Sequence, residues 1–273
     1  MPELPEVETV KETLKLQVLN KVIKKVDVYY DNIVASPSTD LFVKKLINKK
    51  IINIERKGKW LIFDLGSICL LSHLRMEGKY YIRNVEDEKL KHEHVRFTFI
   101  DNQTLRYIDT RKFGKMYLVD KDRMYNCKPL SDLGKEPFDK SLDVFYLKSK
   151  YSNKKLPIKT VLLDQSIITG IGNIYADEIL FLCKINPKIK CNLLTDKNLM
   201  DIIDNTKIVL NKAIKLGGST IRSYSYKEGV HGLFQNELLV HTHEGENCKI
   251  CGNKIIKVKI NGRGTYYCEN CQK

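Results

Sequence analysis

Two adjacent residues at the start of the chain could carry out covalent chemistry. The chain begins Met-Pro-Glu-Leu-Pro-Glu-Val-Glu, so removal of Met1 would leave a free secondary amine on Pro2. A secondary amine that attacks an aldehyde carbon forms a charged iminium ion, which draws electrons away and promotes elimination. Glu3 could give or take a proton at the same carbon. A plainer interpretation stays open, because proline and carboxylates also suit the first turn of any helix.

A second set of reactive side chains lies at the other end of the chain. It consists of two Cys-x-x-Cys pairs separated by sixteen residues, Cys248 with Cys251 and Cys268 with Cys271. This spacing is typical of a zinc ion held by four thiolates. Disulfides or a redox pair are the alternative, and they are less expected in a chain without an export signal. We therefore predict one structural zinc.

The residues between the two cysteine pairs predict a β-hairpin. Ile256, Val258 and Ile260 alternate with polar residues and lead into an Asn261-Gly262 turn. A unit of about 30 residues buries too little surface to fold alone, so bound metal would supply its stability. Arg263 follows the turn, where a guanidinium could clamp a phosphate or simply be solvated.

The secondary structure that must position these two ends is predicted to differ between the first and second halves of the chain. Apolar residues at helical spacing from Val7 to Val18 predict a helix that anchors the N-terminus. Short apolar or alternating runs follow at 22–34, 51–54, 60–65, 68–74, 80–83, 95–100, 105–108 and 116–119, with one expected helix at 41–47. Short strands without regular helical crossovers predict an antiparallel sandwich or barrel.

The second half of the chain predicts helices. Residues 127–140 are rich in Pro, Gly, Asp and Lys and predict a linker. Helices are expected near 142–151, 158–163, 174–183 and from a Thr195–Asp196 cap to Gly217-Gly218. The glycine-flanked turn before Asn173 could seat a phosphate at a helix N-terminus, or merely begin a helix. The polar, aromatic stretch 219–232 predicts a lid, a base-binding loop or a loop without function.

The charge of the chain narrows its partners. The net charge is +14, which favours a polyanion such as nucleic acid, although a general drift toward lysine would also raise it. Apolar runs are too short to span a bilayer, and the first residues lack the pattern of an export signal. We expect a cytoplasmic protein with no membrane partner. Four further cysteines are expected to be ordinary thiols, namely Cys69, Cys127, Cys183 and Cys191.

Four motifs in this order resemble the bacterial formamidopyrimidine-DNA glycosylases. They are the Pro-Glu-Leu-Pro-Glu start, the β-rich half, Gly-x-Gly-Asn-Ile-Tyr-Ala in the helical half, and the final Cys-x-x-Cys hairpin ending in Cys-Gln-Lys. The resemblance implies a base-excision repair enzyme that removes oxidised purines such as 8-oxoguanine and cuts the strand at the abasic sugar by β,δ-elimination. It also implies a monomer that acts on damaged or abasic double-stranded DNA at the bacterial nucleoid.

The resemblance assigns roles to individual residues. Pro2 is similar to the family's nucleophile, Glu3 to its proton donor and Glu6 to a supporting carboxylate. Lys59 matches a lysine that acts in β-elimination and Arg263 an arginine that acts in δ-elimination. Met76 resembles the residue that fills the void, while Arg111 and Phe113 resemble those that face the orphaned base and wedge the stack. Positions that match DNA contacts are His73, His92, Lys155, Lys159 and Asn173.

These expectations define a fold and its rivals. We predict an α+β protein with an N-terminal helix and antiparallel β-sandwich at 1–128, a linker at 129–140, a helix-two-turn-helix domain with a lesion-recognition loop at 141–235, and a zinc finger at 236–273. Thr110 stands where the family often has proline, and the sequence of the 219–232 loop leaves lesion preference open. The rivals are an endonuclease VIII-type glycosylase for oxidised pyrimidines and a zinc-dependent DNA-binding protein without chemistry. Leu4 and the context of Lys59 favour the purine type.

Overall fold

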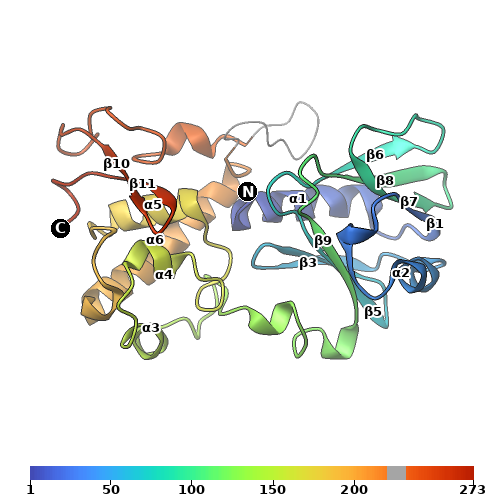
Figure 1. The fold of residues 1–273 in the computed structure, drawn as a ribbon, viewed down its shortest axis with the longest axis horizontal. Helices are drawn as coiled ribbons and strands as arrows, with labels where there is room; N and C mark the ends of the chain where they lie inside the picture. Colours follow the sequence, from blue (N-terminus) through green and yellow to red (C-terminus); the bar gives the residue numbers. More distant parts are fainter. Residues whose placement is uncertain (220–231) are drawn as a thin grey trace. The chain divides into compact units, whose positions relative to one another are not determined.

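A computed structural model describes residues 1–219 and 232–273, which form two compact units (Figure 1). The first unit comprises residues 1–131, and the second comprises residues 132–219 and 233–273. Most of the 219–232 stretch, where a lesion-recognition loop was predicted, lies outside the described residues. Among the described residues, no helix is both long and apolar enough to cross a bilayer.

The first unit contains two β-sheets and two helices. The helices are α1 (Leu4–Val18) and α2 (Thr39–Leu46), and the strands are β1 (Ile23–Val28), β2 (Val34–Ser36), β3 (Asn53–Lys57), β4 (Trp60–Asp64), β5 (Ile68–His73), β6 (Lys79–Asn84), β7 (Glu93–Phe99), β8 (Gln103–Ile108) and β9 (Lys115–Asp120). One sheet has the order β1-β7-β8-β6 and the other β2-β9-β5-β4-β3. The predicted α+β class is confirmed.

Both sheets of this unit contribute to one apolar core. Its members include Phe97 of the first sheet, Phe63 of the second, and the predicted stripe of α1 from Val7 to Val18. The helix packs against β3 and β4, so burial of its apolar stripe fixes the N-terminal end on the sheet. Among the described strands β2 and β9 are the one parallel pair, an exception to the antiparallel prediction. Local alternation cannot reveal strand direction, and these two short segments lie about 80 residues apart in the sequence.

The second unit is helical and ends in the hairpin. It contains α3 (Val144–Tyr151), α4 (Ile158–Leu162), α5 (Asn173–Leu182), α6 (Asp196–Lys215), β10 (Ile256–Ile260) and β11 (Arg263–Tyr267). The predicted cap of α6 is present, because the Thr195 side chain accepts from the Asn198 backbone and the Asn198 side chain accepts in return. A small apolar cluster joins Phe181 of α5 to Val240, Cys248, Ile255 and Cys268. The cysteine-bearing segment is therefore packed directly on α5.

Candidate active site and zinc hairpin

The N-terminal residues are held in place by the start of α1. Pro2 precedes the helix, Glu3 is its N-cap, and both are buried together with Glu6. The backbone N–H of Glu3 donates to Oε2 of Glu6 at 2.8 Å. This contact fixes the backbone next to Pro2 and leaves two carboxylates at the positive end of the helix. The geometry suits a nucleophile with an adjacent proton carrier.

Lys59 lies in the turn of the β3–β4 hairpin, where its side chain is buried. One guanidinium connects this turn to α1, since Arg56 donates through Nε to Glu8 at 2.7 Å and through Nη1 to the carbonyl of Gly58 at 2.9 Å. Burial alone would raise the pKa of Glu8, but hydrogen bonds from Lys11 and Arg56 outweigh it and lower that pKa. Arg56 thus holds the helix that carries Pro2 and the turn that carries Lys59 as one piece.

Two loops of the first unit carry the residues predicted to enter the duplex. The Met76 loop comprises residues 74–78 and the Phe113 loop comprises residues 109–114. Met76 is 37% exposed and Phe113 is 49% exposed. The guanidinium of Arg111 lies over the Phe113 ring, 4.8 Å from its centroid. Each loop therefore exposes an apolar side chain to solvent, and the predicted role of these groups in the duplex stays a prediction.

The two predicted histidine contacts differ in chemistry. His73 is buried beside Trp60, and its Nδ1 accepts the backbone N–H of Arg75 at 2.9 Å, so Nε2 is the donor. Burial lowers the pKa of His73 to about 3, and the charges of Arg75 and Lys59 act in the same direction. His73 is thus a neutral N–H donor at physiological pH. His92 is partly exposed and joins the Phe113 loop through its carbonyl, which accepts the N–H of Asp109 at 3.1 Å.

In the second unit, the start of α5 is joined to the hairpin. Asn173 is the first residue of α5, and its side chain donates to the carbonyl of Gly264 at 2.9 Å. Gly264 follows Arg263, which is exposed at the start of β11. The bond holds the tip arginine near the N-terminus of α5, a combination that suits a phosphate. Lys155 is exposed on the segment before α4.

The prediction that Lys159 contacts DNA does not fit its position. The side chain is fully buried, and its Nζ donates to Oδ1 of Asp177 at 2.6 Å and to the Asn173 carbonyl at 2.8 Å. The other Asp177 oxygen lies 2.6 Å from Nδ1 of His241. Moving the ammonium to a phosphate would leave a buried carboxylate without it, which is costly. Lys159 instead joins α4 to α5.

Glu178, the next residue of α5, holds the chain that leads to the hairpin. Its carboxylate accepts the backbone N–H groups of Leu239, Val240 and His241 at 2.8, 3.0 and 2.9 Å. Burial raises the pKa of Glu178, although these three hydrogen bonds oppose the rise. Asp177 and Glu178 of α5 therefore hold residues 239–241, which precede the cysteines, against the helix.

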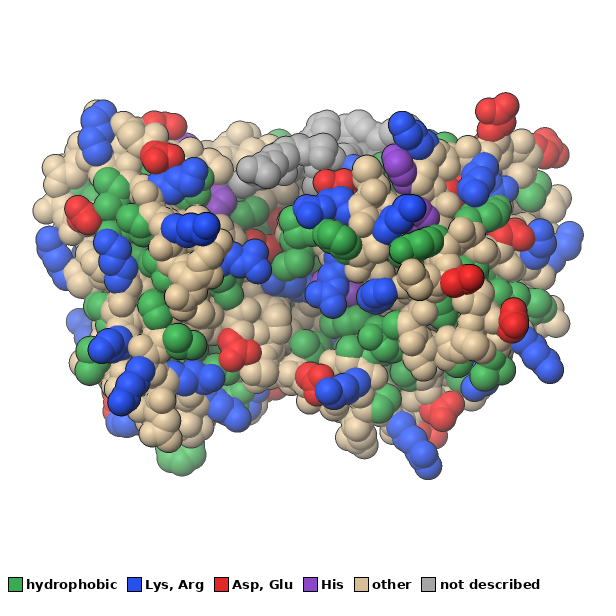
Figure 2. Space-filling view, viewed as in Figure 1, with side chains coloured by type: hydrophobic (Ala, Val, Ile, Leu, Met, Phe, Trp, Pro, Cys, Tyr) green, Lys and Arg blue, Asp and Glu red, His purple; other side chains and the backbone are tan. Residues whose placement is uncertain are grey.

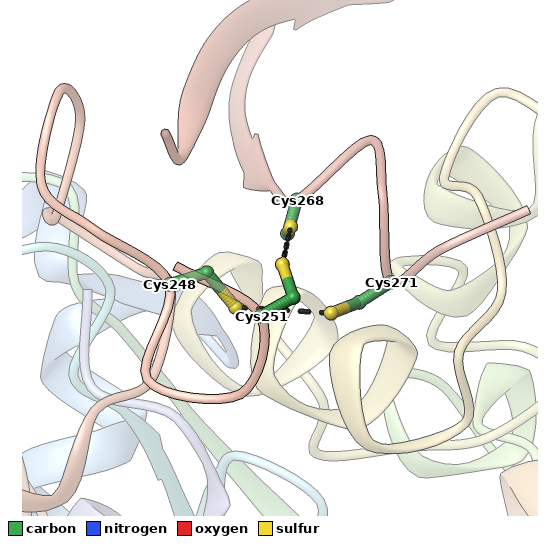
Figure 3. Close-up of side chains that lie close together, drawn as sticks. All are labelled: Cys248, Cys251, Cys268 and Cys271. Carbon is green, nitrogen blue, oxygen red and sulfur yellow. Dashed lines mark hydrogen bonds between the residues drawn. The ribbon is translucent and has the colours of Figure 1, made fainter. Parts of the chain in front are cut away.

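The four predicted metal ligands come together at the end of the chain (Figure 3). The sulfur atoms of Cys248, Cys251, Cys268 and Cys271 all lie within 4.8 Å of one another, with Cys248 and Cys271 at 3.8 Å and Cys251 and Cys268 at 3.4 Å. A tetrahedral zinc with Zn–S bonds of about 2.3 Å requires S···S separations of roughly 3.8 Å, so the set fits zinc. The two nearby histidines have other partners, since Nδ1 of His241 lies 2.6 Å from Asp177 and Nδ1 of His243 lies 2.9 Å from Glu246.

Basic side chains lie on the surface of both units on the face drawn in Figure 2. In the chain as a whole, Lys and Arg outnumber Asp and Glu by 47 to 33. Such a surface attracts a polyanion through counterion release.

Comparisons with known proteins match the chain along its length. Three family models match it: "Formamidopyrimidine-DNA glycosylase N-terminal domain" at residues 1–116, "Formamidopyrimidine-DNA glycosylase H2TH domain" at 133–225, and "Zinc finger found in FPG and IleRS" at 245–273. The formamidopyrimidine-DNA glycosylase of Oceanobacillus iheyensis is 46% identical over 273 residues, covering 100% of this chain and 98% of that protein. The chain belongs to the formamidopyrimidine-DNA glycosylase family. It is accordingly a base-excision DNA glycosylase and abasic-site lyase with one structural zinc.

Other relatives agree with this assignment. The formamidopyrimidine-DNA glycosylase of Bacillus subtilis is 44% identical, covering 100% of this chain and 99% of that protein. A mutant of the Lactococcus lactis enzyme, solved with DNA containing Fapy-dG, has a TM-score of 0.94 at 39% identity, with 100% of each chain covered. The Lactococcus lactis enzyme with DNA containing an abasic site has a TM-score of 0.93 at 39% identity, with 99% of each chain covered. The predicted resemblance is confirmed.

Several residues that shape these sites of the formamidopyrimidine-DNA glycosylase fold escaped the sequence interpretation. They are Arg56, Asp109, Asp177 and Glu178, which make the contacts described above and below. The sequence did hold a signal for Asp177 and Glu178. These two adjacent acids interrupt the otherwise apolar run of α5, and buried acids need hydrogen-bond or ionic partners. Arg56 and Asp109 lie within three residues of the predicted Lys59 and Arg111, but nothing in the local sequence distinguishes them from solvated charges.

Proposed function

We propose that this glycosylase acts through Pro2 after Met1 is removed. The Pro2 nitrogen bonds to C1′ of the damaged nucleotide as the N-glycosyl bond breaks, and the base leaves. Glu3 donates a proton to the ring oxygen as the sugar ring opens, and Pro2, whose nitrogen has lost its own N–H proton, is left joined to C1′ as an iminium ion. Stepwise proton loss from the sugar then expels the 3′ and 5′ phosphates, with Lys59 acting in β-elimination and Arg263 in δ-elimination. The observation that carries the proposal is the Glu6 to Glu3 contact, which holds Pro2 at the buried start of α1.

The remaining site residues bind and open the DNA in this proposal. His73 donates its neutral N–H to a phosphate, while His92, Lys155 and Asn173 add further DNA contacts. Met76 fills the void left by the everted nucleotide, Arg111 faces the orphaned base and Phe113 wedges the stack. Support comes from the exposure of Met76 and Phe113 and from the donor geometry of His73.

The substrate class is oxidised purines such as 8-oxoguanine and formamidopyrimidines, in double-stranded DNA, with abasic sites as a second substrate. Solved relatives bound to DNA containing Fapy-dG or an abasic site support it. A second candidate, oxidised pyrimidines, is favoured by one relative, the Lactococcus lactis enzyme solved with "an oxidized pyrimidine containing DNA". We further propose that the enzyme acts as a monomer in the cytoplasm at the nucleoid. The division into 1–128, 129–140, 141–235 and 236–273 stays a prediction.

Borohydride trapping tests both the chemistry and the substrate. Duplexes carrying 8-oxoguanine or an oxidised pyrimidine are incubated with enzyme and reductant, and the crosslinked peptide is mapped. We expect attachment at Pro2 and faster trapping on the purine lesion. Attachment at a lysine with Pro2 unmodified would refute the mechanism, and preference for the pyrimidine would favour the second candidate.

Variants of the helix start provide the control. Pro2→Gly should weaken trapping and leave duplex binding largely intact, whereas equal loss of both would mean that Pro2 is only architectural. Pro5→Ala changes the other proline of the same helix start without altering the amine, so it should trap normally. Intact-mass measurement showing that Met1 is retained would favour a DNA-binding protein without this chemistry.

A further inference from the structure

The Phe113 loop is wound around a single buried carboxylate. Asp109 has no exposed surface, and its oxygens accept the backbone N–H groups of Arg111 at 3.0 Å, Phe113 at 2.9 Å and Gly114 at 2.8 Å. The N–H of Lys112 donates to the Asp109 carbonyl at 3.2 Å, and Lys112 has a φ of +59°. Hydrogen bonds to an ionised acceptor are about twice as strong as neutral ones, so one side chain fixes the course of the loop.

The Met76 loop and the Phe113 loop close on the same hydroxyl group. Tyr107, at the end of β8, is fully buried, and its Oη lies 3.4 Å from Oδ2 of Asp109. A Cβ at Gly114 would lie 1.7 Å from this oxygen, and one at Gly78 would lie 2.3 Å from it. Real Cβ atoms do not approach so closely, so both loops need glycine where they cross the phenol.

Tyr107 itself has a fixed position. Its ring packs against Tyr80 of β6, with centroids 5.2 Å apart, and belongs to the core shared by the two sheets. A close-packed protein interior has low compressibility and deforms little when force acts on it. The hydroxyl is therefore a rigid reference point for the loops that touch it.

We propose that Tyr107 and Asp109 are positioning residues for base eversion. They fix the Met76 loop and the Phe113 loop in position relative to each other. As a result, Met76, Arg111 and Phe113 enter the duplex as a single rigid wedge. Opening a base step costs a few kcal/mol, and a loop that could yield would bend before the stack opened. This inference rests on the proposed function, because it assigns these three side chains to the opened stack.

The test separates opening of the duplex from the covalent step. The first substrate is a duplex with 8-oxoguanine beside 2-aminopurine, whose fluorescence rises on unstacking and is followed by stopped flow. The second is a single strand with an abasic site, trapped with borohydride, which has no stack to open. Asp109→Asn should slow the fluorescence change by about tenfold or more, the effect of losing a charged hydrogen bond. Trapping on the single strand should stay within about twofold of the parent, because no wedge is needed there.

A milder variant and a matched control accompany Asp109→Asn. Tyr107→Phe removes one hydroxyl and should slow the same step about threefold, the effect of one neutral hydrogen bond. Asp64→Asn is the control, since Asp64 is also a buried carboxylate of this unit that accepts a backbone N–H, that of Gly66 at 2.9 Å. Asp64→Asn should change neither the rate of the fluorescence change on the duplex nor trapping on the single strand.

The decisive comparison is with Phe113→Ala. If Asp109 acts through the wedge, Asp109→Asn should slow unstacking less in a Phe113→Ala background than it does in the parent. Additive effects, an unchanged fluorescence step in both Asp109→Asn and Tyr107→Phe, or equal loss on both substrates would overturn the positioning role. A parent enzyme that cannot be trapped on either substrate would instead overturn the proposed function.

Discussion

Asp177→Asn should destabilise the second unit by about 3 kcal/mol. The substitution removes the charge that faces the fully buried ammonium of Lys159 at 2.6 Å. Removing one partner of a buried ion pair costs roughly 3 to 5 kcal/mol. The lower end applies here, because Lys159 retains the carbonyl of Asn173 at 2.8 Å and the new amide keeps one oxygen for either Lys159 or His241.

Urea unfolding followed by two probes can distinguish a loss of stability in the second unit from a change in the first. The only tryptophan of the chain, Trp60, is buried in β4 of the first unit, whereas far-ultraviolet circular dichroism also reports the helices of the second. With a slope of about 2 kcal/mol per molar urea, the circular dichroism midpoint should fall by about 1.5 M. The Trp60 transition should move less.

Two comparisons make the result decisive. Lys148 and Asp196 form an Asp–Lys pair of the same unit at 2.8 Å, but both side chains are largely exposed, so Asp196→Asn should cost under about 1 kcal/mol. Combining Lys159→Met with Asp177→Asn removes both charges and should recover most of the loss. A cost for Asp177→Asn no greater than the control, or no recovery in the double variant, would refute the assignment of a buried ion pair.

Three further results are expected. Between pH 6.5 and about pH 4 the free energy of unfolding of the parent should fall by roughly 3 kcal/mol more than that of His73→Gln. The reason is that the His73 imidazole gains a proton below pH 6.5 in the unfolded chain but not in the folded one, where its pKa is about 3. Equal declines of the two proteins in urea titrations across this pH range would contradict the prediction. Cys268→Ser should bring zinc content well below one equivalent and abolish DNA binding, and tight binding without zinc would show that the hairpin is dispensable. Lys155→Ala should reduce the slope of log affinity against log salt by about one, whereas Lys159→Met should leave it unchanged, and the reverse pattern would restore Lys159 as a phosphate contact.

The sequence by itself determined the features that depend on neighbouring residues. The spacing of Val7 to Val18 gave the α1 stripe, the Thr195 cap began α6, and two Cys-x-x-Cys pairs around an Asn-Gly turn gave the zinc hairpin. Each is encoded within a few residues or by one repeated spacing, so periodicity and turn chemistry suffice to find it. The N-terminal Pro-Glu pair belongs here too, because its chemistry follows from residue types alone.

Only the tertiary structure decided which charged residues face solvent and which are buried. Lys159 resembled a DNA contact in sequence, yet it pairs with Asp177, which also binds His241 from 64 positions along the chain. Arg56 finds Glu8 across 48 positions. Asp109 finds its partners within five residues, but only the packed structure shows that its carboxylate is fully buried. Burial and partner choice arise from packing between distant segments, and a charge acquires its function only when that packing sets its solvent exposure and its hydrogen-bond partners.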